Sequence, residues 1–410
     1  MTVLYSLALK FYVFAMKLGS SFIPKAKLMI DGRKDLFLQL ERDMNKDSRY
    51  VWIHAASLGE FEQGRPVIEE IQNRYPEYKI VITFFSPSGY EIIKKRNEFE
   101  YVYYMPFDSP QNAKKFIDIV NPEKAYFIKY EFWFHFLKEL NTRGIPTFIF
   151  STIFRKDQIF FKFYGGLMRK TLTFFTHLFV QNKESIELLK NIGIENCSLA
   201  GDTRFDRVND IASDANRLPL VEAFAKDSKV VVCGSTWPQD EDYIIRFLGE
   251  KSLGFKWIVA AHETHKKHID EILRKLNGDA LLYSEATEQN VKDAKILIID
   301  CIGILSSIYQ YADISYIGGG FGAGIHNTLE AATFGLPIVF GPNYMNFKEA
   351  VDLISIEAAF SYNEYEKLDE IFTSLMKNEE YMTSCGAKSA EYVKNNLGAT
   401  ELIVSKSFTV

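Results

Sequence analysis

The sequence predicts an α/β protein made of two doubly wound domains. Short apolar runs alternate with amphipathic helical segments along most of the chain, which is typical of parallel βαβ units. Several runs are continuously apolar, as strands buried on both faces should be. The series restarts midway, and 410 residues exceed what one hydrophobic core usually organises. Ligands of such sheets bind beyond the carboxyl ends of the strands, so we expect a site in a central cleft that both domains face.

The amino terminus is apolar and basic. Residues 1–24 contain lysines but no acid, and Lys10 and Lys17 share a helical face with Ser6. The apolar runs are shorter than the ~20 residues of a bilayer span, and no cleavage site of a signal peptide follows. We expect a helix that lies in, or shallowly enters, an anionic membrane surface. The alternative is a first helix packed on the protein's own core.

The first domain is expected over residues 25–208. Its six predicted strands are Tyr50–Ala55, Lys79–Phe84, Tyr101–Met105, Lys124–Ile128, Thr147–Ser151 and Leu178–Gln181. Helical patterns such as Phe61–Asn73 and Ser88–Lys95 separate them. The polar stretch Asp206–Ser228 is interpreted as the connection between the domains.

The second domain is expected over residues 209–395, with a final segment, 396–410, that packs back on the first. Its predicted strands are Lys229–Gly234, Trp257–Ala261, Ile296–Asp300, Ile314–Gly318 and Pro337–Gly341. The chain as a whole is globular in composition, with 47% hydrophobic and 25% charged residues. A net charge of -5 argues against nucleic acid as a partner. The four cysteines form no CxxC pair, which indicates neither a disulfide framework nor a zinc site.

The stretch YIGGGFGAGIHNTLEAATFGLPIVFGP in the second domain predicts a nucleotide site. Glycines let backbone N–H groups approach a ligand, and a helix that opens near His326 and Asn327 would favour a phosphate at its amino terminus. Glu330, one turn further on, would accept hydrogen bonds from ribose hydroxyls. The glycines assigned to the site are Gly319, Gly320, Gly322 and Gly324.

Other strand ends of the second domain supply further candidates. Gly234, Ser235 and Thr236 suit a phosphate contact, although the two hydroxyls are equally consistent with helix caps. Cys301 and Gly303 would meet a base through backbone groups. The segment HETHKKH lacks the HExxH spacing of a metal site, so its histidines are expected to be solvated, with His262 at the edge of the cleft.

The stretch WIHAASLGEFEQ in the first domain places Glu60 where a strand turns into a helix. Ser57-Leu58-Gly59-Glu60 matches a capping box, which explains an acid here without any catalytic role. A base at the exposed end of a strand is the other interpretation, and a helix amino terminus would keep its carboxylate ionised.

Taken together, HAASLGEFEQGRP, GDTRFDRV, GSTWPQDE and GGGFGAGIHNTLEAATFGLPIVFGPNYMNFKEA resemble the 3-deoxy-D-manno-octulosonic acid (Kdo) transferases of lipopolysaccharide synthesis. The resemblance covers essentially the whole chain. It implies a GT-B glycosyltransferase that inverts the anomeric configuration, with CMP-Kdo as donor and a lipid A precursor as acceptor. It also implies attachment to the cytoplasmic face of the bacterial inner membrane.

The resemblance also implies roles for single residues. Glu60 would be the catalytic base, with Ser57 and Gly59 beside it on the acceptor side. Glu131, in IKYEFW, matches an acidic position of the family, but the proline that many relatives carry nearby is missing; a network role and a contact with the acceptor both stay open. Arg204 would hold the Kdo carboxylate or the CMP phosphate, or else form a hinge salt bridge with Asp202 or Asp206. No metal and no other cofactor is expected.

Two other functions remain possible on the sequence. A GT-B transferase that uses a UDP-sugar would show much of the same glycine pattern. A sugar-nucleotide-binding membrane protein without activity would keep the carboxyl-half glycines and dispense with Glu60.

Overall fold

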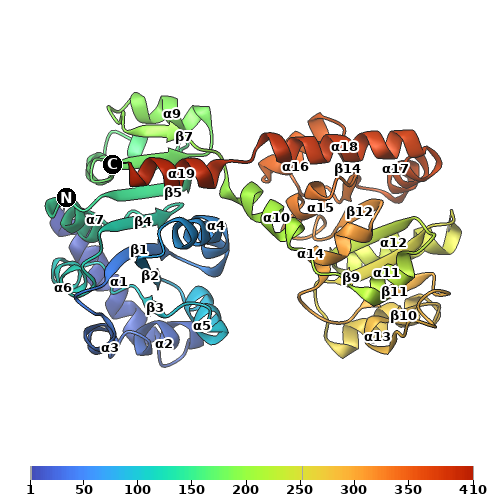
Figure 1. Cartoon of the computed structure of the whole chain (residues 1–410), viewed down its shortest axis with the longest axis horizontal. Helices are drawn as coiled ribbons and strands as arrows, with labels where there is room; N and C mark the ends of the chain where they lie inside the picture. Colours follow the sequence, from blue (N-terminus) through green and yellow to red (C-terminus); the bar gives the residue numbers. More distant parts are fainter. Residues whose placement is uncertain (1, 252, 410) are drawn as a thin grey trace. The chain divides into compact units, whose positions relative to one another are not determined.

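The computed structural model describes residues 2–251 and 253–409, and the chain divides into two compact units (Figure 1). The first comprises Met1–Arg207 and Leu397–Val410, and the second comprises Val208–Asn396. Each unit is a seven-stranded parallel sheet with helices packed on both faces. The fold class predicted from the sequence is therefore confirmed.

The sheet of the first unit has the order β3-β2-β1-β4-β5-β6-β7. The strands are β1 (Arg49–Ala55), β2 (Tyr78–Phe84), β3 (Tyr101–Tyr104), β4 (Lys124–Ile128), β5 (Thr147–Thr152), β6 (His177–Val180) and β7 (Cys197–Leu199). All six predicted strands form, with ends that differ by one residue at most. The edge strand β7 was not predicted, because its three partly exposed residues carry no apolar run.

The helices of the first unit follow local signals. Ser109 begins α6 (Pro110–Val120) by accepting a hydrogen bond from the Asn112 N–H, and Asn121 ends it at a φ of 43°. The other helices after residue 23 are α2 (Pro24–Asp31), α3 (Leu36–Asp43), α4 (Leu58–Arg74), α5 (Pro87–Arg96), α7 (Phe134–Thr142), α8 (Gly166–Leu172), α9 (Lys183–Lys190) and α10 (Thr203–Ser213).

The last helix of the chain, α19 (Ala399–Phe408), belongs to the first unit and packs against α4. The ring of Phe408 stacks on Tyr75 with centroids 3.7 Å apart. Buried Lys124, at the start of β4, donates to the Ser407 carbonyl at 2.9 Å. These contacts tie the carboxyl terminus to the first sheet.

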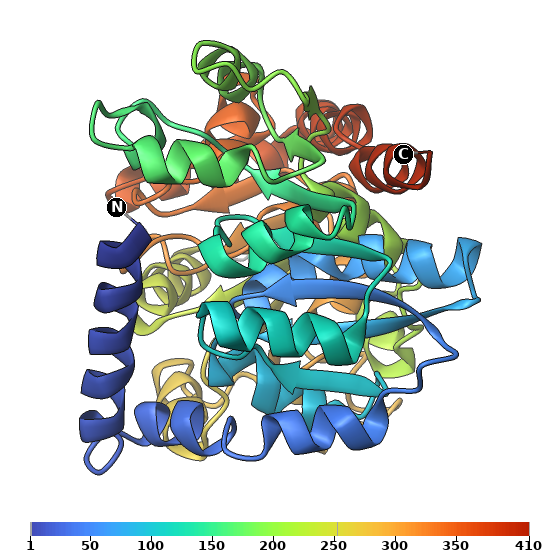
Figure 2. The same cartoon turned by 90° about the vertical axis from the view of Figure 1, so that its left-hand side faces the viewer.

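Helix α1 (Thr2–Gly19) stands at the margin of the first unit (Figure 2). Its 18 residues have a mean hydropathy of 1.2, which is the length and composition of a candidate membrane span. None of the residues that the structure describes in α1 is buried, although partly buried Tyr5 packs against the core of the first unit. The helix is held by Tyr5, whose hydroxyl donates to Asp108 at 2.7 Å, and by Ser6, which lies 2.9 Å from His135 Nε2.

The sheet of the second unit has the order β10-β11-β9-β8-β12-β13-β14. Its strands are β8 (Val230–Thr236), β9 (Lys256–Ala261), β10 (Leu281–Leu282), β11 (Ile296–Ile299), β12 (Ile314–Ile317), β13 (Ile338–Phe340) and β14 (Ala359–Ser361). The helices that cover it include α11 (Pro219–Ala225), α12 (Pro238–Glu250), α13 (Lys266–Lys275), α14 (Leu305–Ile308), α15 (Leu329–Thr333), α16 (Lys348–Ser355), α17 (Tyr365–Lys377) and α18 (Glu379–Asn395).

The short edge strands β10 and β14 were not predicted. The stretch Asp206–Ser228, which was interpreted as the connection between the domains, contains the boundary between the units, together with most of α10 and all of α11. The two units divide within α10, between Arg207 and Val208.

Candidate active site

The two candidate acids of the first unit follow neighbouring strands. The sheet order changes direction between β1 and β4, and ligands of doubly wound sheets bind at such a switch point. Glu60 lies in the first turn of α4, directly after β1, and Glu131 lies in the loop after β4. The topology thus brings both acids to the carboxyl ends of two adjacent central strands.

Glu60 caps its helix in a different way from the predicted capping box. Its Oε2 accepts from the backbone N–H of Ala56 at 2.6 Å, whereas among the described residues the side chain of Ser57 has no capping partner. Burial and the nearby charge of Glu131 raise the pKa of Glu60, although the Ala56 N–H, Lys129 and His54 act against the shift. A carboxylate with a raised pKa is a stronger base once it is ionised.

Glu131 is buried in a network of ring N–H groups. Its Oε2 accepts from Trp133 Nε1 at 2.6 Å and lies 2.9 Å from His54 Nε2. His54 belongs to β1, and sequence reasoning missed it as a site residue. The available signal was a histidine inside an apolar strand run, where a ring needs partners for both nitrogens.

Gly59 leaves open space next to Glu60. It is exposed, and within the described part of the chain a Cβ here would meet no atom within 4 Å. The packing of this unit therefore does not require a glycine at this position. A small residue does keep the approach to the carboxylate open, as an acceptor-side position would require.

Backbone strain occurs at strand ends in each unit. Lys129 and Ser151, with φ values of 63° and 56°, lie at the ends of β4 and β5 in the first unit. Ser235, with a φ of 54°, lies near the end of β8 in the second unit. Left-handed backbone is costly for residues with a Cβ and is often retained at functional sites.

In the second unit the switch point lies between β8 and β12. Gly234 lies within β8, near its carboxyl end, and its carbonyl accepts from the N–H of Gly318 at 2.9 Å. A Cβ on Gly318 would lie 2.2 Å from the Ser235 carbonyl oxygen, and one on Gly320 would lie 2.6 Å from Gly341 backbone atoms. These glycines are therefore required by the close approach of two backbones, and not only by a ligand.

The remaining glycines of the predicted set differ from one another. Gly319 and Gly324 have φ values of 93° and 141°, which favour glycine, and the Gly319 N–H is occupied by buried Asp240 at 2.9 Å. Gly322 is exposed, and its nearest neighbour for a Cβ is 3.7 Å away. Of this set, Gly322 is the position whose packing leaves room for a ligand.

Three aromatic rings stack at this edge. His262 stacks on both Trp237 and His326, with ring centroids 4.7 Å and 4.5 Å away. Trp237 Nε1 donates to His326 Nε2 at 3.0 Å, and burial together with His262 lowers the pKa of His326. Trp237, in the motif GSTWPQDE, was not among the predicted site residues.

The helix expected at His326 and Asn327 begins later, at Leu329, and α15 has only five residues. Asn327 accepts from the Leu329 N–H at 3.1 Å and donates to Glu330 at 3.0 Å. Asn327 and Glu330 are therefore neighbours, as predicted, but they lie at the start of a single short turn.

Two other predictions at this edge need correction or refinement. Thr236 is buried and donates to Glu241 at 3.1 Å, and Glu241 also lies 2.9 Å from His268. The hydroxyl of Thr236 is therefore bound to a buried side chain, which argues against the predicted phosphate contact. His268 is buried, so the prediction that it is solvated was wrong. Cys301 is exposed, and Gly303 has a φ of 98°, both in the loop after β11.

Arg204 forms the salt bridge that sequence reasoning gave as an alternative. Both its Nε and its Nη2 lie 2.8 Å from Asp202 Oδ2. Asp202 also accepts from Gln63 of α4 at 2.7 Å. Asp206 instead caps α19, through the N–H groups of Gly398 and Thr400.

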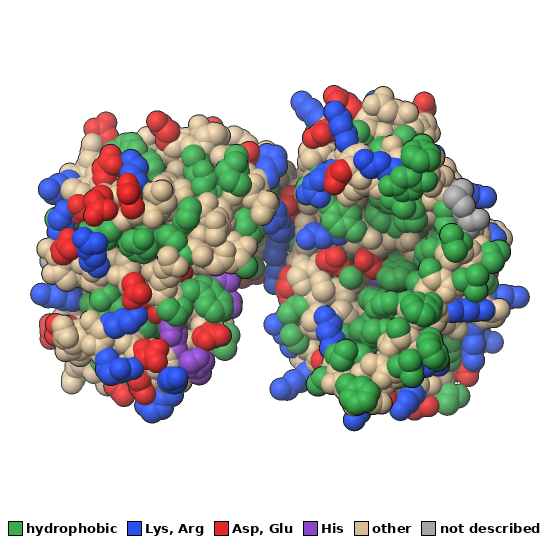
Figure 3. Space-filling model, turned by 180° about the vertical axis from the view of Figure 1, so that it is seen from behind, with side chains coloured by type: hydrophobic (Ala, Val, Ile, Leu, Met, Phe, Trp, Pro, Cys, Tyr) green, Lys and Arg blue, Asp and Glu red, His purple; other side chains and the backbone are tan. Residues whose placement is uncertain are grey.

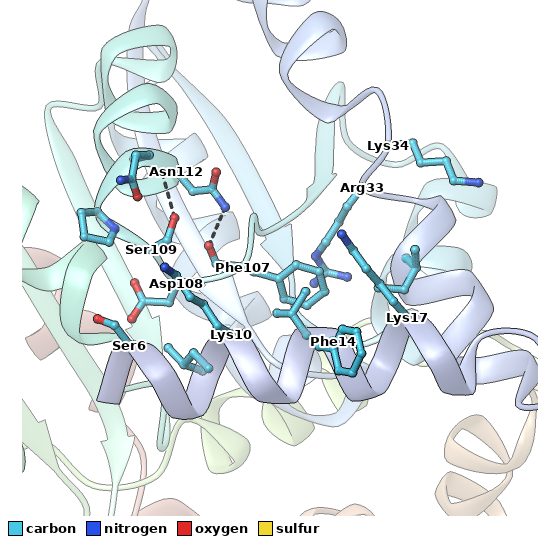
Figure 4. Close-up of a pocket in the computed structure, with 15 residues that line it drawn as sticks. Ser6, Lys10, Phe14, Lys17, Arg33, Lys34, Phe107, Asp108, Ser109 and Asn112 are labelled. Atoms are coloured by element: carbon cyan, nitrogen blue, oxygen red, sulfur yellow. Dashed lines mark hydrogen bonds between the residues drawn. The ribbon is translucent and has the colours of Figure 1, made fainter. Parts of the chain in front are cut away.

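A cavity of about 810 Å³ lies between α1 and the body of the first unit (Figure 4). Lys10 and Lys17 reach into it from the same side of α1, together with apolar Val13 and Phe14. Arg33, on the opposite wall, donates to three backbone carbonyls, and burial lowers its pKa to about 10, so it stays cationic at neutral pH.

Comparison with known proteins identifies the first unit. Residues 33–207 match the family model of the 3-deoxy-D-manno-octulosonic-acid transferase (kdotransferase). This part of the chain is thus a Kdo transferase domain. The protein is therefore an enzyme, a glycosyltransferase.

Curated members of the family match most of the chain. The 3-deoxy-D-manno-octulosonic acid transferase of Rickettsia bellii is 25% identical over 383 residues, which cover 90% of this chain and 91% of the relative. That of Haemophilus influenzae is 23% identical and covers 86% of this chain and 85% of the relative.

Solved structures show the same fold. UDP-GlcNAc 2-epimerase from Neisseria meningitidis superposes with a TM-score of 0.62 at 17% identity, covering 88% of this chain and all of that one. MurG from Acinetobacter baumannii superposes with a TM-score of 0.55 at 13% identity, with the same coverage. These likenesses place the chain in the GT-B fold class.

Proposed function

We propose that the protein transfers Kdo from CMP-Kdo to a lipid A precursor, lipid IVA, in lipopolysaccharide synthesis. The observation that supports this most is the position of Glu60: an acid with a raised pKa, beside an open glycine, at the switch point of a Kdo transferase domain. The direct test is incubation of the purified protein with CMP-Kdo and tetraacylated lipid A precursor, with mass spectrometry of the lipid product.

Glu60 acts as the base in this proposal. Its carboxylate takes the proton from a glucosamine hydroxyl of the acceptor, and the oxygen attacks the anomeric carbon of Kdo as the bond to CMP breaks. One displacement inverts the anomeric configuration. The Ala56 N–H holds the carboxylate in place at 2.6 Å, so little reorganisation precedes the proton transfer.

The second unit holds the donor. Gly322, His326 and Asn327 lie near the phosphate in this proposal, and Glu330 accepts from the ribose hydroxyls. The exposed ring of His262 and the loop of Cys301 and Gly303 border the same sheet edge. Arg204, which pairs with Asp202, would meet the anionic sugar in this proposal. The proposal includes no metal and no other cofactor.

In this proposal the first unit binds both the acceptor and the membrane. Hydrophobic side chains, interspersed with Lys and Arg, gather on this unit (Figure 3). On α1 the exposed ones include Leu4, Leu7 and Phe11, at 57–72% exposure. An apolar helix with lysines suits the anionic cytoplasmic face of the inner membrane. The cavity beside it is lined by cationic and apolar side chains, which complement the head group and the chains of an anionic lipid.

Deletion of residues 1–24 is expected to release folded protein from membranes, because α1 contributes no buried residue to the core. Flotation with anionic vesicles measures the association, and calorimetry with CMP is the control for the fold. Tight vesicle binding by the truncated protein would contradict an anchor in α1.

Glu330→Ala is expected to weaken CMP binding ten-fold or more, since a hydrogen bond to a charged group contributes about 1.5–3 kcal/mol. Calorimetric titration measures the affinity. Glu366→Ala, which changes an exposed side chain of α17, serves as the matched control. Wild-type affinity in Glu330→Ala would remove this residue from the nucleotide site.

Competition separates the proposal from a UDP-sugar transferase. If CMP displaces the bound donor and UDP does not, the nucleotide preference is that of a CMP-sugar enzyme. Stronger binding of UDP would favour the alternative.

A further inference from the structure

Helix α1 carries two different stripes of side chains. One stripe is apolar and 57–72% exposed, and it comprises Leu4, Leu7, Phe11 and Leu18. The other contains Lys10 and Lys17, which lie two helical turns apart and line the cavity between α1 and the body of the first unit (Figure 4). When the apolar stripe enters a membrane, as in the proposed function, the two lysines stay turned towards the protein.

These lysines have no acid to pair with. Within the part of the chain that the structure describes, neither ammonium group has a carboxylate partner. Asp108 is the one acid among the described lining residues, and it is buried. Its two oxygens accept from the Tyr5 hydroxyl at 2.7 Å and from the backbone N–H groups of His135 and Phe136 at 3.1 Å. The charge of Asp108 is therefore already engaged on the far side of the cavity wall.

The opposite wall adds positive charge. Arg33 donates to three backbone carbonyls at 2.8 Å, and its guanidinium lies 4.5 Å from the ring centroid of Phe107. None of these partners is an anion, so the charge of Arg33 acts on the cavity. The first turn of α6, which carries the positive end of the helix dipole, lines the same space. Lys34 contributes less, because it pairs with Asp31 at 2.6 Å.

The rest of the lining is apolar, and its side chains include Leu9, Val13, Phe14 and Ile30. A ligand that matches the whole cavity therefore carries an anion and an alkyl chain. Inorganic phosphate would leave the apolar wall uncovered. The volume of about 810 Å³ lies within the roughly 300–1,000 Å³ of ligand sites, which suits a head group and the first part of its chains. A disaccharide with four acyl chains is too large to enter as a whole.

A single phosphate can engage both lysines. Seven residues separate Lys10 from Lys17, which is about 10 Å along the helix axis. Each ammonium group sits on a flexible four-carbon stem, so both can converge on one anion between them. Both side chains are exposed in the cavity, which leaves them accessible to a ligand.

We propose that this cavity binds one anionic glycerophospholipid of the membrane, at a site separate from the acceptor site. Lys10 and Lys17 hold the phosphate, and the chains leave along Val13 and Phe14 into the bilayer. The bound lipid neutralises the lysines and fills the space between α1 and the body of the first unit. The inference depends on the membrane placement of α1 in the proposed function, and it does not depend on Kdo transfer.

Native mass spectrometry of the full-length protein in a non-ionic detergent tests the site. With dioleoyl phosphatidylglycerol as the probe, we expect saturable retention of one lipid per protein. Dioleoyl phosphatidylcholine has the same chains and no net charge, so it should bind ten-fold or more weakly. Lys10→Ala/Lys17→Ala should raise the half-saturating concentration of phosphatidylglycerol ten-fold or more, whereas Lys10→Arg/Lys17→Arg should keep it near the wild-type value.

The matched control is Lys25→Ala/Lys27→Ala. It removes the same charge from neighbouring α2, where both lysines are exposed and neither lines the cavity. Lipid retention should then equal that of the wild type. An equal loss in the two alanine variants would show only a general attraction to anionic lipid and would overturn the proposal. Calorimetry with CMP and thermal melting confirm that each variant is folded.

Competition identifies the source of the anion. Neither inorganic phosphate nor the tetraacylated lipid A precursor should displace phosphatidylglycerol at an equal concentration. Displacement by inorganic phosphate would reveal a plain anion site, and displacement by the precursor would assign the cavity to the acceptor; each result would overturn the proposal. A wild-type protein without Kdo transfer would refute the proposed function instead, and the lipid titrations would still decide this inference.

Discussion

Glu60→Gln is expected to lower the turnover of Kdo transfer by ~10²–10⁴-fold, the usual contribution of a general base. The amide retains an oxygen that accepts from the Ala56 N–H, so the start of α4 stays capped. It cannot take a proton, and the acceptor hydroxyl then remains a weak nucleophile. CMP affinity should be unaffected. Transfer rate, calorimetry with CMP and thermal melting on one preparation distinguish the base from a helix cap.

The same variant has a stability signature that follows from the raised pKa of Glu60. The folded protein binds a proton at this carboxyl more tightly than the unfolded chain does. Stability from this group therefore falls as the pH rises from the ordinary carboxyl value to the raised one, and it stays lower above that range. Glu60→Gln avoids the cost of ionisation, so we expect a melting temperature no lower than wild type at pH 7, with the difference shrinking below about pH 4.

Near-normal turnover in a stable Glu60→Gln protein would leave only the capping role. Glu62→Gln, two residues further along the same helix and on a different face, is a suitable control. Its carboxylate pairs with Arg65 and Arg96 on the surface of the unit, and its loss should change turnover little.

Gly318→Ala is expected to have the largest effect on stability. The new Cβ would lie 2.2 Å from the Ser235 carbonyl oxygen and 2.6 Å from the Thr236 Cα. Both are backbone atoms of β8, so relief requires β8 and β12 to separate. Overpacking costs typically 1–3 kcal/mol, and we expect about 3 kcal/mol here. The melting temperature of the second unit should fall by roughly 10 °C, with loss of CMP binding.

Gly322→Ala is the matched control four residues further on. Its Cβ would have its nearest neighbour at 3.7 Å, and its φ does not demand glycine. Stability should therefore stay within about 0.5 kcal/mol of wild type. Weaker CMP binding in this well-folded variant would place the ligand at Gly322. Equal melting of the two variants would contradict the backbone collision at Gly318.

The strands that form both sheet centres were predictable from the sequence. Their residues are predominantly apolar, and a strand that is covered on both faces of the sheet needs this composition whichever strands lie beside it. The missed strands β7, β10 and β14 lie at or near sheet edges and have only two or three residues. So short a segment carries no period of its own, and it becomes a strand because a longer neighbour pairs with it.

The candidate site was predictable in part. Two features follow from spacings of a few residues along the chain. They are the position of Glu60 at a strand end and the contact between Asn327 and Glu330. The helix start at His326 was wrong, because the Gly318 carbonyl binds the His326 N–H and keeps the chain out of helical geometry until Leu329.

What the sequence by itself determined is therefore the order of strands and helices and the residues that follow each strand, since these depend on local patterns. Only the tertiary structure decided what those residues do for one another. His54 meets Glu131 across 77 positions of the chain, and Asp240 meets Gly319 across 79. Gly318 and Gly320 allow two backbone segments to pass close to each other, so a ligand is not the only reason for a glycine at these positions. Contacts of this range arise when neighbouring strands pair, and no spacing along the chain encodes them.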